Sequence, residues 1–320
     1  MKIGFIGAGS IGSLFGGYLA SIHTDENPLK VIFFCRKDHS DAINENGLEL
    51  IAANKKSLLP NIQSYKSMED FSKANGNNRN FRFDYLFLTT KAYDSEVALI
   101  QYKKLVKSCH WLVILQNGLG NEEKVRENCN ENKIIRIITS HGALIKNPGV
   151  VSHTGLGFTK IGFAFPTQSQ ENLHQLQRLL DKGGIKTEIV EDIIRCSWEK
   201  AFVNIGINAL GALTRLKNGQ LLENEDLKRL MCRTVEEALE VAKLKGINLL
   251  DRNYCDLMYS VAERTYNNKN SMLQDVLKGK PTEIDFLNGK IVEFAKDLGI
   301  RVPVNELLTF LVKGLEKSFE

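Results

Sequence analysis

Two kinds of hydrophobic pattern alternate along the first half of the chain. Short, almost continuously apolar runs are separated by segments in which apolar residues recur every three or four positions. The first pattern is typical of parallel strands covered on both faces, and the second is typical of amphipathic helices. The expected strands are residues 2–6, 30–35, 85–89, 111–115, 134–140 and 187–191. The expected helices are residues 12–21, 93–106, 121–127 and 172–182. This alternation predicts a doubly wound α/β domain.

Two segments depart from the alternation. Residues 72–83 are polar and rich in asparagine, and we expect them to form a solvated surface loop. Residues 150–163 carry β-branched side chains around a Gly-x-Gly sequence, which predicts a β-hairpin.

The strand pattern ends near residue 192, and only helical patterns follow. The expected helices are residues 198–216, 225–244, 252–266, 282–298 and 305–318. We therefore predict an α/β domain over residues 1–192 and an all-α domain over residues 193–320. The length of 320 residues is consistent with two domains.

Charge and composition exclude several classes of protein. The formal net charge is only +4, with no long basic run, which argues against a nucleic-acid partner. No apolar stretch reaches the length of about 20 residues that spans a bilayer. Six glycines between Gly4 and Gly17 interrupt the apolar start of the chain, which disfavours a signal peptide.

The six cysteines lie far apart, without a Cys-x-x-Cys pair, at positions 35, 109, 129, 196, 232 and 255. This spacing predicts neither a metal site nor a disulfide framework, so we expect reduced thiols and a cytoplasmic protein.

A glycine-rich turn follows the first expected strand directly. It reads Gly7, Ala8, Gly9, Ser10, Ile11 and Gly12, which is a G-x-G-x-x-G sequence between a strand and a helix. In a Rossmann-type domain the first glycine permits the turn, the second lets the backbone approach a diphosphate, and the third allows the helix to pack closely. The turn therefore predicts dinucleotide binding at a helix N-terminus.

The end of the second strand indicates which dinucleotide is bound. NAD-binding proteins usually place an acidic residue there to hold the ribose 2′-hydroxyl. In this chain Arg36 and Lys37 follow the strand, and the first acid is Asp38. A guanidinium can bind a 2′-phosphate through paired hydrogen bonds, so we expect NADP(H). The alternative is that Arg36 is simply a surface cation.

A polar stripe crosses an otherwise apolar helix in the second half. Lys200, Asn204 and Asn208 are four residues apart, so they share one helical face. Buried polar groups need partners, which favours a stripe that faces a polar ligand over a solvated helix edge.

Further polar residues could complete such a site. Asn268, Ser271 and Asp275 have helical spacing, with Ser271 a plausible cap, and Glu283 is expected on the following helix. Lys91 and Asn117 follow expected strands, where open α/β sheets bind ligands. His141 and His153 lack the spacing of metal ligands and are expected to be structural. We expect no metal site.

Together these motifs resemble those of the ketopantoate reductase (2-dehydropantoate 2-reductase) family along almost the whole chain. The resemblance rests on GAGSIG, TKAYDSEVAL, QNGLGNEE, SHGALIKNPGVVSHTGLG, WEKAFVNIGINALGAL, Asn218-Gly219, NSMLQDVLKGKPTEIDFLNG and VPVNELL. The segment SMLQDVLKGKPTEID is the most specific of these. The asparagine-rich loop departs from the family in length, without touching a matched motif.

The resemblance implies a Rossmann domain and a helical domain similar to that of 6-phosphogluconate dehydrogenase, with the active site in the cleft between them. It implies NADPH-dependent reduction of 2-dehydropantoate to (R)-pantoate in pantothenate biosynthesis. Lys200 matches the family's general acid, and Glu283 matches its substrate-binding carboxylate. The family's other substrate-binding residues match Asn117, Asn204, Asn208, Asn268 and Ser271.

For the cofactor we expect contacts from residues 7–12, Arg36, Lys91, Asn117 and Glu283. Two alternatives remain open, a reductase of another branched 2-oxo acid and a non-catalytic NADP-binding regulator. The expected partner is a small 2-oxo acid, without nucleic acid or membrane, and a homodimer is left open.

Overall fold

The computed structural model describes the 320-residue chain except for residues 23–28, 54, 77–80, 168–169 and 320. Its largest element is an eight-stranded sheet in the order β12-β11-β8-β7-β6-β1-β2-β5. Its strands are β1 (Lys2–Ile6), β2 (Lys30–Phe34), β5 (Gln63–Tyr65), β6 (Tyr85–Leu88), β7 (Trp111–Ile114), β8 (Ile134–Thr139), β11 (Thr159–Phe163) and β12 (Thr187–Ile189).

Six neighbouring strands of this sheet, from β5 to β8, run parallel. Their order is the doubly wound order of dinucleotide-binding domains, in which the first strand lies at the switch point. Strand β11 pairs antiparallel with β8, and β12 runs parallel to β11. The α/β fold expected from the sequence is therefore confirmed.

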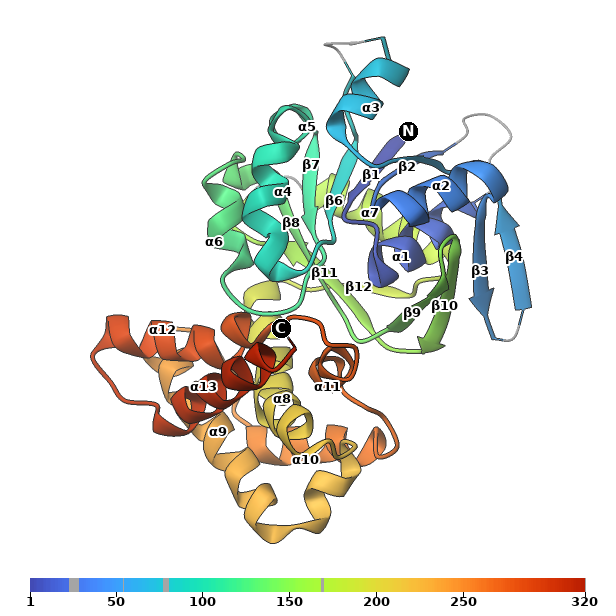
Figure 1. The fold of residues 1–320 in the computed structure, drawn as a ribbon. Helices are drawn as coiled ribbons and strands as arrows, with labels where there is room; N and C mark the ends of the chain where they lie inside the picture. Colours follow the sequence, from blue (N-terminus) through green and yellow to red (C-terminus); the bar gives the residue numbers. More distant parts are fainter. Residues whose placement is uncertain (23–28, 54, 77–80, 168–169, 320) are drawn as a thin grey trace. The chain divides into compact units, whose positions relative to one another are not determined.

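Alternate residues of the central strands enter two separate cores. Phe5, Phe33 and Phe87 pack with residues of the helices on one face. Ile6 and Phe34, one position further along, pack with residues of the helices on the other face. Figure 1 shows α1 and α7 on the first face and α4, α5 and α6 on the second. Burial on both faces explains why these strands read as continuous apolar runs.

The helices of this half are α1 (Ser10–Ala20), α2 (Lys37–Asn46), α3 (Met68–Ala74), α4 (Ser95–Gln101), α5 (Lys103–Ser108), α6 (Asn121–Arg126) and α7 (Gln170–Gly183). Short 3₁₀ helices cover η1 (Ala92–Asp94) and η2 (Glu131–Lys133). The single helix expected over 93–106 is thus divided into η1, α4 and α5, with a break at Tyr102, whose ring is buried against Phe34. Packing of this aromatic side chain accompanies the departure from the local helical pattern.

The expected hairpin over 150–163 is wrong. A second, four-stranded sheet has the order β4-β3-β10-β9 and consists of β3 (Leu48–Ala52), β4 (Lys55–Leu59), β9 (Gly142–Asn147) and β10 (Val150–Gly155). The hairpin lies one strand earlier, because β10 pairs antiparallel with β9, whereas β11 belongs to the large sheet. The turn at Gly149 has a positive φ of 76°, which explains the glycine there.

The expected solvated loop over 72–83 is also wrong in its described parts, and residues 77–80 lie outside them. The first three residues end helix α3. Phe81 and Phe83 are both buried. Phe81 packs edge-on against Phe71 and Phe83, and Phe83 stacks on Phe71. The polar composition of the segment concealed two aromatic residues that complete the core.

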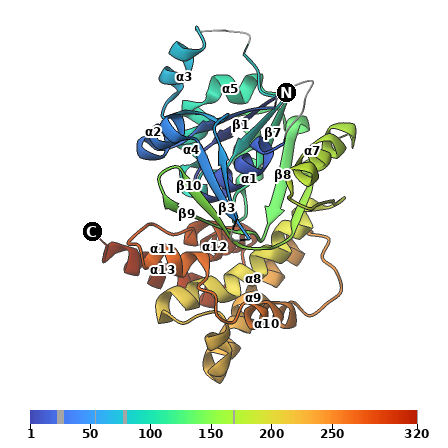
Figure 2. The same ribbon diagram turned by 90° about the vertical axis from the view of Figure 1, so that its right-hand side faces the viewer.

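The second half is helical, as expected. It contains α8 (Ile193–Thr214), η3 (Gly219–Glu223), α9 (Glu225–Leu244), α10 (Tyr254–Arg264), α11 (Ser271–Val276), η4 (Ile284–Phe286), α12 (Asn288–Leu298) and α13 (Pro303–Lys317). Residues of α8, α9, α10, α12 and α13 share one hydrophobic core. Figure 2 shows the orange and red helices of this half from a second side. The helix expected over 282–298 is interrupted at Leu287, whose φ and ψ of −117° and −100° are not helical.

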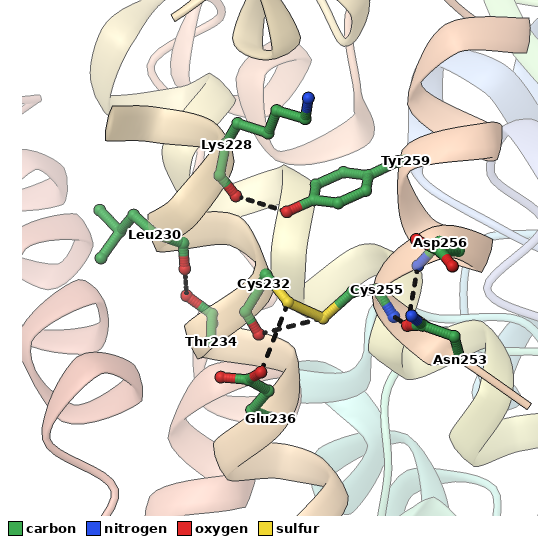
Figure 3. Close-up of a disulfide and its surroundings, with 9 residues drawn as sticks. All are labelled: Lys228, Leu230, Cys232, Thr234, Glu236, Asn253, Cys255, Asp256 and Tyr259. Carbon is green, nitrogen blue, oxygen red and sulfur yellow. Dashed lines mark hydrogen bonds between the residues drawn. A yellow bond between two sulfur atoms is a disulfide. The ribbon is translucent and has the colours of Figure 1, made fainter. Parts of the chain in front are cut away.

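A disulfide joins Cys232 of α9 to Cys255 of α10, which corrects the expectation of reduced thiols at these positions (Figure 3). The two residues are 23 positions apart in sequence, but neighbouring helices bring their Cα atoms to 5.2 Å. The two sulfur atoms and the Glu236 carboxylate also form a cluster of possible metal ligands, whose ligand atoms lie within 4.8 Å of one another. Sulfur in a disulfide lacks the thiolate charge that binds metals, so the oxidised pair is not a metal site.

Contacts between Cα atoms divide the chain into two compact units. The α/β unit consists of residues 1–116 and 121–193, and the helical unit consists of residues 117–120 and 194–320. The segment Asn117–Gly120 therefore packs with the helices although it follows strand β7. Among the described residues, no helix has the length and apolar character needed to cross a membrane.

Candidate active site

The glycine-rich turn lies at the carboxyl end of β1, in the α/β unit. Gly7 has a positive φ of 77°, and a Cβ atom there would come within 2.8 Å of the Thr90 backbone. The N–H groups of Gly7 and Ala8 donate to the carbonyl oxygen of Phe34 at 2.9 and 3.0 Å. The turn is thereby fixed to the end of β2, and no larger residue would fit at its first position.

The other two glycines of the turn have different causes. A Cβ atom at Gly12 would lie 2.5 Å from Thr89 Oγ1, so close helix–strand packing requires this glycine. At Gly9 the nearest atom to an added Cβ is the Gly7 oxygen at 3.8 Å, so packing within the chain does not require a glycine. Gly9 is also the N-cap of the 11-residue helix α1 and offers no side-chain cap. An open backbone at a helix N-terminus fits a diphosphate.

The other residues expected at the cofactor fall into both units. Arg36 is exposed at the N-cap of α2, two residues beyond the end of β2. Lys91 is half-buried and precedes η1, just beyond β6. Ser10 and Ile11 form the first turn of α1. By contrast, Asn117 and Glu283 belong to the helical unit, where they lie at one pocket.

This pocket is formed entirely by residues of the helical unit. It is lined by Asn117, Asn204, Asn208, Ser271, Met272, Asp275, Glu283 and Leu287. Polarity and spacing in the sequence single out six of these residues. The two that they miss, Met272 and Leu287, are buried apolar residues, and nothing in a local pattern distinguishes a pocket wall from ordinary core.

Helix α8 supplies the cationic and amide groups of the site. Lys200 donates a hydrogen bond from Nζ to Asn117 Oδ1 at 2.6 Å, although the two residues are 83 positions apart. Asn204 and Asn208 follow along the pocket wall at helical spacing. The ammonium is thus held beside the pocket by an amide that also lines it.

A close backbone approach explains how Asn117 reaches this helix. The N–H of Leu119 donates to the Phe286 carbonyl oxygen at 2.9 Å. Gly118 has a φ of 88°, and an added Cβ would lie 2.7 Å from Phe286 Cβ. The chain around Asn117 is therefore attached to the segment that carries Glu283.

Glu283 is buried, with a side chain and backbone that are together only 6% exposed. Contrary to expectation, it does not lie within a helix, because it is the N-cap of the 3₁₀ helix η4. The preceding Thr282 accepts the Ile284 N–H at its hydroxyl and donates its own N–H to Glu316 Oε1 at 2.7 Å. These bonds fix the backbone on both sides of the carboxylate.

The expected stripe of Asn268, Ser271 and Asp275 is wrong as a single helical face. Helix α11 begins at Ser271, and its cap is Asn270, whose Oδ1 accepts the Leu273 N–H at 2.9 Å. Ser271 and Asp275 line the pocket, but Asn268 precedes the helix and is exposed. Binding of substrate by Asn268 stays a prediction.

His141 and His153 contact each other, as expected of structural histidines. Their Nδ1 and Nε2 atoms are 3.0 Å apart, and the Tyr18 hydroxyl lies 2.7 Å from His153 Nδ1. Burial lowers the pKa of both histidines, and for His141 the neighbouring His153 lowers the pKa further. Neither ring is part of the pocket described above.

Two family models match the chain. Residues 3–164 match the model described as "Ketopantoate reductase PanE/ApbA", and residues 192–316 match "Ketopantoate reductase PanE/ApbA C terminal". The curated 2-dehydropantoate 2-reductase of Pyrococcus horikoshii is 38% identical over 99% of this chain and 98% of its own length. The enzyme of that name from Archaeoglobus fulgidus is 33% identical over 99% and 98%.

Solved structures show the same similarity over the whole chain. A PanE/ApbA family ketopantoate reductase from Ralstonia eutropha has a TM-score of 0.87 and 28% identity, with 100% of this chain and 99% of that chain covered. A D-mandelate dehydrogenase bound to NADH and anilino(oxo)acetate also has a TM-score of 0.87, with 25% identity and the same coverage. That dehydrogenase thus holds a dinucleotide and anilino(oxo)acetate together.

Proposed function

Because the chain belongs to the ketopantoate reductase PanE/ApbA family, we propose that it reduces 2-dehydropantoate to (R)-pantoate with NADPH. The family uses NADPH, and the reaction is a step of pantothenate biosynthesis. The observation that carries the proposal is the Lys200–Asn117 hydrogen bond at a pocket that also contains Asn204, Asn208 and Glu283. Such a pocket offers a proton donor, amide groups and a carboxylate to one small polar substrate.

The polar residues of the pocket bind the substrate in this proposal. Amide N–H groups of Asn204 and Asn208 donate to substrate oxygens, and Ser271 donates or accepts through its hydroxyl. The Glu283 carboxylate accepts a hydrogen bond from a substrate hydroxyl. A buried carboxylate that is built to accept this bond disfavours an analogue without the hydroxyl, since its removal leaves the acceptor unpaired.

Lys200 acts as the general acid. When bound, NADPH supplies a hydride to the C2 carbonyl carbon. Lys200 donates a proton from Nζ to the oxygen of that carbonyl as negative charge develops there. Asn117 holds the ammonium in position through its side-chain oxygen. The conversion of the carbonyl to an alcohol thereby consumes one hydride and one proton.

The α/β unit holds the dinucleotide. The backbone around Gly9 and the N-terminus of α1 bind the diphosphate, with Gly7, Ala8, Ser10, Ile11 and Gly12 shaping the turn. The guanidinium of Arg36 binds the 2′-phosphate. Lys91 adds a second cation beyond strand β6. We further propose that residues 1–192 form the cofactor domain and residues 193–320 the substrate domain. We also propose that the protein acts in the cytoplasm, and a homodimer stays open.

A spectrophotometric assay tests the proposal. Purified protein with NADPH and 2-dehydropantoate should lose absorbance at the nicotinamide band and form (R)-pantoate. Lys200→Ala should lower kcat by about 10²- to 10⁴-fold, the usual contribution of a positioned proton donor, with NADPH affinity nearly unchanged. Wild-type protein that binds NADPH but does not turn over 2-dehydropantoate would overturn the substrate assignment.

A second candidate is a reductase of another branched 2-oxo acid. The similarity to a D-mandelate dehydrogenase bound to NADH and anilino(oxo)acetate favours it, because the same fold serves another substrate there. A panel of 2-oxo acids with both cofactors separates the two candidates. The highest kcat/KM for 2-dehydropantoate supports the first, and a higher value for an acid without the 4-hydroxyl supports the second.

A further inference from the structure

A buried histidine connects three elements of the α/β unit. His39 lies in the first turn of α2 and is only 6% exposed. Its Nε2 is 2.9 Å from Ser13 Oγ of α1. Its Nδ1 is 2.9 Å from the backbone nitrogen of Gly149, in the turn between β9 and β10.

The partners of the ring determine where its proton lies. The Gly149 N–H can only donate, so His39 Nδ1 must accept and carries no hydrogen. The single proton of the neutral ring is therefore on Nε2 and is donated to Ser13 Oγ. Ser13 in turn donates its hydroxyl hydrogen to the carbonyl oxygen of Ala8 at 3.1 Å. The hydrogen bonds thus run in one direction, from Gly149 through His39 and Ser13 to Ala8.

The two ends of this connection belong to different parts of the proposed dinucleotide site. Ala8 lies in the glycine-rich turn that would hold the diphosphate. Arg36, three residues before His39, is the N-cap of α2, and its carbonyl oxygen accepts the Ser40 N–H at 3.0 Å. One imidazole therefore connects the start of α2, where the 2′-phosphate would bind, to the turn that binds the diphosphate.

We propose that His39 is a positioning residue for NADP(H), which fixes the Arg36 end of the cofactor site relative to the glycine-rich turn. The inference rests on the proposed function, because it assumes that these residues bind the dinucleotide. His39 acts without touching the cofactor. Its contribution lies in the hydrogen bonds to Ser13 and Gly149, which prevent α2 from shifting relative to α1.

Protonation of His39 would disrupt this arrangement. A second ring proton would place Nδ1–H against the Gly149 N–H, so that two donors face each other. Burial also lowers the pKa of His39 from its ordinary value. Affinity that depends on neutral His39 is therefore constant at neutral pH and falls as pH decreases through this lowered pKa.

The neighbouring groups do not supply a compensating charge. Helix α1 and strand β5 carry no acidic or basic side chain. Four charged residues of α2 and β9 lie close in sequence to His39 or Gly149, and all four are exposed to solvent: Lys37, Asp38, Asp41 and Lys146. Burial is the cause of the lowered pKa of His39.

Two substitutions separate the two hydrogen bonds of the ring. His39→Asn keeps an acceptor near the position of Nδ1 for Gly149 but loses the donor to Ser13. His39→Gln keeps a donor near the position of Nε2 but loses the acceptor. Ser13→Ala removes the bond to Ala8 while leaving His39 in place. His174→Gln, at an exposed histidine of α7, is the matched control.

The measurement is the Kd of NADPH and of NADH by nicotinamide fluorescence between pH 8 and pH 5.5, together with thermal unfolding of the free protein. At pH 8 we expect His39→Asn and Ser13→Ala to raise the Kd of NADPH about 3- to 10-fold, which corresponds to the loss of one neutral hydrogen bond. NADH should weaken less, because it lacks the phosphate that Arg36 would bind. Below pH 6.5 the NADPH affinity of wild-type protein should fall towards that of the His39 variants, whereas His174→Gln should follow wild-type protein.

Because a 2′-phosphate itself titrates near pH 6, the ratio of variant to wild-type Kd is compared at each pH, rather than the Kd of one protein alone. Folded variants that bind NADPH as tightly as wild-type protein would overturn the inference. Equal weakening of NADPH and NADH, in parallel with a lower Tm, would also overturn it, because it would indicate a merely structural role. If His39 variants do not fold, Ser13→Ala decides by the same criteria. Wild-type protein without NADPH affinity would instead refute the proposed function.

Discussion

Asn117 offers a direct test of the active site, because its role is visible only in three dimensions. Its side-chain oxygen accepts the Lys200 hydrogen bond at 2.6 Å. Hydrogen bonds to charged groups are worth about 1.5–3 kcal/mol, and each 1.36 kcal/mol in the barrier changes a rate about tenfold. If Asn117 orients the ammonium for proton transfer, Asn117→Ala should lower kcat by roughly 10- to 150-fold.

A second substitution at the same position distinguishes orientation from simple packing. Asn117→Asp keeps an oxygen acceptor of the same shape but adds a negative charge beside Lys200, which favours the charged ammonium. The rate should fall at high pH as Lys200 loses its proton, and in Asn117→Asp this decrease should move to higher pH. Both variants need full pH profiles of kcat and kcat/KM.

Asn132, an exposed asparagine of η2 in the α/β unit, provides the matched control as Asn132→Ala. It should leave kcat, KM and the pH profile unchanged. An Asn117→Ala enzyme with kcat within twofold of the wild-type value, at unchanged stability, would refute the orienting role of this residue. Unchanged pH profiles in Asn117→Asp would show that its side chain does not sense the proton on Lys200.

Three further predictions follow from charge, connectivity and protonation. Arg36→Asp should weaken NADPH binding about 10- to 150-fold through loss of a charge-assisted pair, with a much smaller effect on NADH binding. If fluorescence titrations show that both cofactors bind equally more weakly, Arg36 does not bind the 2′-phosphate. The cysteines of the Cys232–Cys255 disulfide are 23 residues apart in sequence, and its reduction should lower the free energy of unfolding by about 3 kcal/mol. Cys232→Ser should be as stable as the reduced protein, and a Tm that does not respond to reductant would contradict this. The pKa values of His141 and His153 are lowered in the folded protein, so unfolded chains bind more protons, and denaturant titrations should show stability falling as pH decreases below about 6.5. Replacement of both histidines by glutamine should flatten this decrease, and an unaltered slope would rule out the pair as its source.

The parts of the fold that the sequence predicts well are those whose signal is local. The expected helix over 225–244 matches α9 at both ends, because an amphipathic pattern begins directly after the capping side chain of Asn224. The central strands were equally clear, since both of their faces are buried. By contrast, β3 is only partly buried, and β4 is largely exposed. Their sheet depends on the pairing of β3 with β10, about 100 residues later, which no local pattern reports.

The disulfide was missed for a related reason. Spacing rules detect cysteines that are close in sequence, whereas Cys232 and Cys255 become neighbours only when α9 packs against α10. The same limit applies to Asn268 and Ser271, which share a helical spacing without sharing a helix. Periodicity specifies a face only where a helix is actually continuous.

The segment Asn117–Gly120 shows how packing between distant residues completes a site that spacing alone outlines. Helical spacing places Lys200, Asn204 and Asn208 on one face in the sequence, and two of them, Asn204 and Asn208, line the pocket. The amide that binds Lys200 comes instead from a segment that directly follows a strand of the α/β unit. Gly118 permits this arrangement, since a side chain there would collide with Phe286. The glycine is therefore as much a part of the site as the polar residues, although it contributes no functional group.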